Sequence, residues 1–151
     1  MIPAFAAIGI FVADVATRER RAGTLGFIYS SPRLKSRFVI WKMASVLIVA
    51  LLVIAIPLLR AHSFITAVVG IFFVCALAIS LGVISGNPKT FIVVYLTFWY
   101  VAVSDKGATP ALNFAGFMRT PPIAIVAGYF AASIALLLAA EAMHRRSLNL
   151  S

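Results

Sequence analysis

The length and continuity of the apolar runs constrain this fold more than any other feature. A helix needs about 20 apolar residues to cross a bilayer. Four long runs occur, at residues 38–59, 63–85, 90–104 and 123–143. Membrane β-barrels instead show alternating segments of about 10 residues. The runs therefore predict an all-α fold, a polytopic helical membrane bundle with four spans, of which the third is the shortest.

Composition supports a membrane protein over a soluble domain. The 151 residues are 63% hydrophobic and 11% charged, whereas soluble domains are about 25% charged. The net charge of +9 could suggest nucleic acid, but the basic residues flank the apolar runs. Their placement indicates membrane topology instead. We therefore expect a lipid bilayer as surroundings and no nucleic-acid partner.

The basic residues also predict an orientation. The polar stretch 17–37 carries six of them and one acid, Glu19. Placing it in the cytoplasm puts ten of the 13 Lys and Arg residues inside and three outside. Because cytoplasmic loops are enriched in Lys and Arg, we expect a multi-pass protein of the inner (plasma) membrane. Its C-terminus would be cytoplasmic.

Two segments are ambiguous. Residues 1–16 form either an interfacial or re-entrant segment or the end of a membrane helix, and we interpret them as the latter. Residues 105–122 have an apolar middle that is too short to cross a bilayer. They form either a re-entrant outer element covered by neighbouring helices or an extracytoplasmic loop on the headgroups. The sequence leaves both readings open.

Small residues at four-residue spacing mark candidate helix contacts, because they let helices approach closely in lipid. The second span and the turn after it contain Ala78, Gly82 and Gly86. The last span contains Ala124, Gly128 and Ala132. Near the end of that span, Glu141 and Arg145 are four residues apart and can pair.

The sequence shows little catalytic chemistry. It holds four acids and two histidines, with no nucleophile beside an evident base and no phosphate-binding glycine loop. We therefore predict no catalytic residue, no metal site and no cofactor. The protein would not be an enzyme.

The stretch 17–37 contains a short amphipathic element. Thr24 can cap a helix and Pro32 can end it. Leu25, Ile28 and Tyr29 fall at positions i, i+3 and i+4, which gives one apolar face. A headgroup-bound loop would explain the cations equally well. The element itself is uncharged, however, which favours contact with a protein.

These residues resemble the type 2 (exporter-type) ABC transporter permeases. The resemblance rests on the run Glu19-Arg-Arg-Ala-Gly23-Thr24-Leu25, the pair Ser31-Pro32 and the lysine that opens the next span. In that family this stretch forms a cytoplasmic coupling helix that contacts the ATP-binding subunit. Three spans, a re-entrant outer element and a last span follow. The resemblance would cover the family's pattern from the end of its second helix to its C-terminus. The chain has Gly26 where the family often has an acid.

The resemblance implies an export function powered by ATP hydrolysis on a separate ABC subunit. The bundle would pair with a second permease half, in a homo- or heterodimer. The implied docking face is Leu25, Phe27, Ile28 and Tyr29, oriented by Arg18, Arg20 and Arg21. The chain would be the C-terminal part of such a permease. The alternative is a small stand-alone integral membrane protein with a structural or partner-binding role. Nothing in the sequence selects a substrate.

Overall fold

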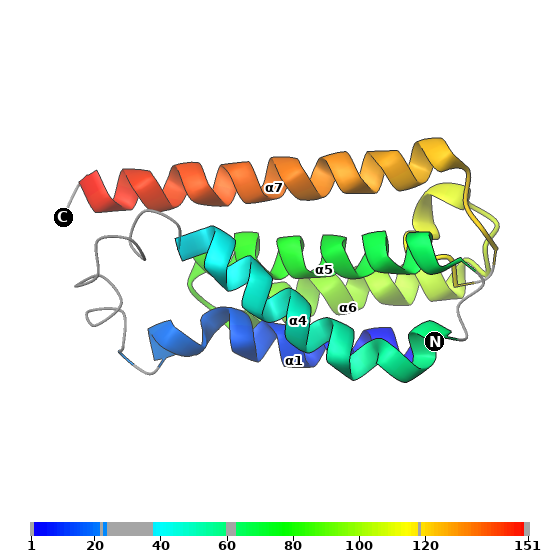
Figure 1. Cartoon of the computed structure of the whole chain (residues 1–151), viewed down its shortest axis with the longest axis horizontal. Helices are drawn as coiled ribbons and strands as arrows, with labels where there is room; N and C mark the ends of the chain where they lie inside the picture. The colour runs from blue at the N-terminus through cyan, green and yellow to red at the C-terminus, as the bar shows by residue number, and fades with distance from the viewer. Residues whose placement is uncertain (1, 22, 24–37, 60–62, 118, 150–151) are drawn as a thin grey trace.

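The computed structural model describes residues 2–21, 23, 38–59, 63–117 and 119–149. These residues form five α-helices and one short 3-10 helix, without a strand among them (Figure 1). The elements in chain order are α1 (Ile2–Arg21), α4 (Phe38–Leu59), α5 (Phe64–Ser85), α6 (Pro88–Ser104), η1 (Pro110–Leu112) and α7 (Ile123–Asn149). The predicted all-α class is confirmed.

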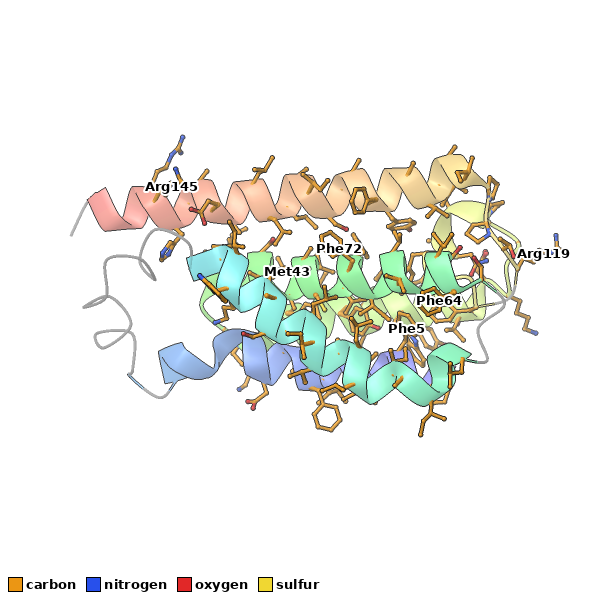
Figure 2. The ribbon with its side chains drawn as sticks, in the orientation of Figure 1. Phe5, Met43, Phe64, Phe72, Arg119 and Arg145 are labelled. Carbon is orange, nitrogen blue, oxygen red and sulfur yellow. The ribbon has the colours of Figure 1, made fainter. Side chains whose placement is uncertain are left out.

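Successive helices run in opposite directions along the long axis of the molecule (Figure 1). Figure 2 shows Phe5, Phe64 and Arg119 towards one end, and Met43 and Arg145 towards the other. The start of α1 and the connection from α6 to α7 therefore share the first end. The end of α1, the start of α4 and the end of α7 share the second. We call these the loop end and the basic end.

Helix α5 forms the centre of the bundle and contacts α1, α4, α6 and α7. Its buried positions lie on all sides of the helix, and most carry small or β-branched side chains that allow close packing. Helix α1 contacts α4, α5 and α6, whereas α7 packs chiefly on α5. Most of α7 and one side of α4 thus face outwards, and their outward surfaces are apolar apart from the basic end.

The helices overlap the predicted spans, although α7 continues beyond the predicted end at residue 143 to Asn149. Helix α4 has the predicted bounds, and α5 begins one residue late because Ser63 is its N-cap and accepts a hydrogen bond from the Thr66 amide. Gly86, at φ +64°, ends α5 in the left-handed conformation that glycine favours. Helices α4, α5 and α7 are long and apolar enough to cross a membrane. Helix α6, with 17 residues, is shorter and rises only about 25 Å.

Helix α1 extends beyond the predicted bounds. Residues 17–21, predicted to open the cytoplasmic loop, are helical as far as Arg21. The segment Thr-Arg-Glu-Arg-Arg contains good helix formers and no breaker, so charge alone does not stop the helix. Gly23, at φ +67°, is the first residue in the sequence that favours a stop.

Candidate functional site

Some of the predicted coupling residues lie in helix α1, and the others are not among the residues that the structure describes. Arg18, Glu19, Arg20 and Arg21 belong to the last turns of α1, at the basic end. Gly23 follows with a positive φ. Thr24, Leu25, Phe27, Ile28 and Tyr29 lie outside the described residues. The amphipathic coupling element therefore stays a prediction.

Charged side chains of other helices lie at the basic end too. Lys42 is near the start of α4, Lys89 near the start of α6, and Arg146 near the end of α7. The predicted pair on α7 is confirmed, because Arg145 Nε donates to Glu141 Oε1 at 2.8 Å. This end therefore carries an excess of positive charge. The last turns of α1, which contain Arg18, Arg20 and Arg21, add to it.

The small-residue row of α5 packs inside the bundle. Ala78 and Gly82 are buried, and Gly86 is the C-cap of the helix. Between them, Ser80 donates to the carbonyl oxygen of Leu136 on α7 at 2.9 Å and to Ala76 at 2.7 Å. The close α5–α7 approach thus brings a side-chain hydroxyl within reach of the neighbouring backbone.

The row of α7 lies on the opposite side of its helix from α5. Ala124, Gly128 and Ala132 are exposed, and a Cβ added to Gly128 would meet no described atom within 4 Å. The face that packs inwards includes Ser133 and Ala140. Among the described residues, therefore, this row is not buried against another helix.

The loop end contains a feature that the sequence left open. Residues 113–117 are all buried, although they belong to a connection and not to a helix. The Gly116 amide donates to the Asn113 carbonyl at 3.2 Å, which closes a β-turn. Gly116 has φ +67°, a conformation that suits glycine. We call residues 113–117 the buried turn.

The Asn113 side chain pairs with two backbone groups of this connection. It is 5% exposed. Its Oδ1 accepts from the Phe117 amide at 2.7 Å, and its Nδ2 donates to the Arg119 carbonyl at 2.6 Å. Because buried amides cost free energy when unpaired, one side chain allows the backbone to fold back between helices. The sequence signal was an asparagine three residues before a glycine within an apolar stretch.

Helix α5 is shaped to receive the turn. Thr66, Gly70 and Phe73 lie at i, i+4 and i+7, on one face of the helix. A Cβ on Gly70 would lie 2.8 Å from the Ala115 Cβ and 3.1 Å from the Phe114 carbonyl oxygen. Any side chain at position 70 would therefore push the turn away from α5.

Phe114 is the centre of an aromatic cluster that joins four helices. Its ring centroid lies 5.9 Å from Phe5 of α1, 6.1 Å from Phe73 of α5 and 5.2 Å from Phe98 of α6. Tyr129 of α7 lies 6.0 Å away, and its hydroxyl donates to the Ala111 carbonyl at 2.6 Å. The turn thus fills the space between α1, α5, α6 and α7.

The described residues offer apolar contact and no evident reaction chemistry at this end. Among them, no three His, Cys, Asp or Glu side chains gather as metal ligands would. Comparisons of this chain with protein-family models, with curated proteins and with solved structures find no match.

Proposed function

We propose that the chain is a membrane-spanning permease subunit of an ATP-driven ABC exporter. It would couple a separate ATP-binding subunit to the translocation of a substrate. The proposal places the basic end in the cytoplasm, because positively charged loops stay on that side. The C-terminus then lies in the cytoplasm of a cell whose inner membrane holds the protein.

One observation carries the proposal: the buried turn lies between α6 and α7, at the end opposite the basic segment. The resemblance implies this order, with three spans after the coupling segment, a re-entrant outer element and then a last span. In this proposal α4, α5 and the shorter α6 would be the three spans, and α7 would be the last. Burial of residues 113–117 supports the re-entrant alternative for the outer connection.

The packing suggests how a push at the basic end would reach the bundle. The coupling segment connects α1 to α4, and both helices pack against each other and against α5. A shift of the segment would therefore displace two helices that share the central one. Closure of the ATP-binding subunits would shift these packed helices together. Packed interfaces and cores change between discrete arrangements and do not deform continuously.

The decisive test is a charge on the apolar face of the coupling segment. The full chain, tagged after Ser151 and expressed from its native locus, is purified from membranes in mild detergent. An ATP-binding subunit should co-purify with the wild type and not with Ile28→Asp. Loss of a central anchor costs about 2 kcal/mol or more, and the new charge would be unpaired in the contact. Transport-coupled ATP turnover should fall with it.

Gly26→Asp is the matched control, since the resembled family often has an acid at that position. It adds the same charge to the same segment, and both readouts should survive. Retention of the ATP-binding subunit by Ile28→Asp would show that this face rests on lipid. If the wild type itself retains no ATP-binding subunit, the stand-alone membrane protein becomes the better description.

A further inference from the structure

The buried turn is held in the bundle differently from a helix. The hydrogen bonds of Asn113 and the amides of Gly116 and Phe117 are made within the connection itself. Of the hydrogen bonds among the described residues, one joins this connection to a helix side chain, from Tyr129 to Ala111. Leaving the bundle as a unit would therefore keep these internal hydrogen bonds and break one bond to a helix side chain.

The remaining contacts of the turn are apolar. Phe114 and Phe117 pack on rings of Phe5, Phe73 and Phe98. In water such burial is strongly favourable, but lipid tails are as apolar as these rings, so the hydrophobic effect does not drive association within the membrane. The turn therefore occupies this position, in preference to a lipid hydrocarbon chain, through close packing and a single hydrogen bond to a helix side chain.

The depth of the turn places it where lipid chains reach. Gly70, which contacts Ala115, is the seventh residue of α5, and it therefore lies about 9 Å from the start of that helix. On the α6 side, Lys106 and Gly107 have φ of 51° and 81°. These two residues follow Asp105, the C-cap of α6, and hinges commonly lie in loops near the ends of helices.

We propose that the buried turn is a displaceable plug, and that the site it fills accepts the hydrocarbon chain of a lipid. The walls of that site are the rings of Phe5, Phe73, Phe98 and Tyr129, with Gly70 at its base. These groups match an acyl chain and offer no charge to a polar ligand. The proposal does not depend on the permease role.

A disulfide that locks the plug provides the test. A Cβ built on Gly116 lies 3.5 Å from the Thr66 Cβ, within the range of disulfide geometry. The variant combines Thr66→Cys and Gly116→Cys with Cys75→Ala, which removes the buried native thiol. The protein, in phospholipid vesicles, is photolabelled with palmitic acid that carries a diazirine, and labelled residues are identified by mass spectrometry.

Reduced protein should be labelled at Phe73 and Phe98, and oxidation should lower that labelling severalfold. Leu52 and Ile56, exposed on α4, should be labelled equally in both states, which controls for probe concentration. Equal labelling of Phe73 and Phe98 in the two states would overturn the proposal. Absence of label there in the reduced protein would do so as well.

A second variant keeps the test open if a cysteine at Gly116, with its positive φ, prevents folding. Tyr129→Phe removes the hydrogen bond to Ala111 and nothing else from the ring. Labelling at Phe73 and Phe98 should rise by about threefold to fivefold, the effect of one such bond. Tyr100→Phe, at an exposed tyrosine of α6, should leave the labelling unchanged. An unchanged value for Tyr129→Phe would contradict the plug.

Discussion

The hydroxyl of Tyr95 on α6 donates a hydrogen bond to the carbonyl oxygen of Phe5 on α1, at 2.7 Å. Both side chains are fully buried. The Tyr95 ring stacks on Phe91 with centroids 5.4 Å apart, and it lies directly against Gly9 of α1. The contact of the Tyr95 ring with Gly9 thus fixes how α6 lies along α1. The two hydrogen-bonded residues are 90 positions apart in the sequence.

Tyr95→Phe should destabilise the protein modestly. The substitution keeps the ring and its stacking but removes the donor, so the cost should be about 0.6–1 kcal/mol, the usual value of such a bond in a membrane protein. Thermal unfolding of the purified protein in detergent measures this as a lower melting temperature. Tyr100→Phe, at an exposed position, is the control and should not shift the transition.

Gly9→Ala should cost more than Tyr95→Phe. A Cβ at position 9 would overlap the Tyr95 ring, and overpacking of this kind costs about 1–3 kcal/mol. Adding Tyr95→Leu should recover part of the loss, because a smaller side chain leaves room for the methyl group. If the changes in unfolding free energy from the two substitutions were simply additive, the Tyr95 ring and Gly9 would not be coupled.

Reporter fusions test the orientation. Reporters fused after Arg60 and Gly107 should be outside the cell membrane. Reporters fused after Lys89 and Ser151 should be in the cytoplasm. The helix directions agree with this alternation, because successive helices run in opposite directions (Figure 1). A cytoplasmic reporter signal at Gly107 would mean that α6, the shortest of the predicted spans, does not cross the membrane.

Most of the fold followed from the sequence because apolar runs of bilayer length leave few alternatives. The bounds of α4 and α5 were predicted almost to the residue. The end of α1 was not, since we treated charge as a stop signal. Arg18, Arg20 and Arg21 are good helix formers, and Gly23, the next described residue after the helix, has a positive φ.

The candidate sites were harder to predict. Alanine and glycine occur all around α7, so four-residue spacing could not tell which face packs on α5. The face with Ser133 and Ala140 does so, and the face with Gly128 does not. The buried turn depends on contacts between distant residues, such as Gly70 with Ala115, which no local pattern reports.

Gly70 and Gly128 form a matched pair for the final prediction. Both lie inside helices, so replacement by alanine should stabilise either helix by about 1 kcal/mol through propensity alone. At Gly70 the methyl group would lie 2.9 Å from the Ala115 Cα, a backbone atom that cannot move independently. Gly70→Ala should therefore lower the melting temperature in detergent, whereas Gly128→Ala should leave it unchanged or raise it. Equal shifts in melting temperature would show that the turn does not press on α5 as described.

A loss of oligomers for Gly128→Leu, without loss of monomer stability, would instead identify the α7 row as a contact with a second subunit.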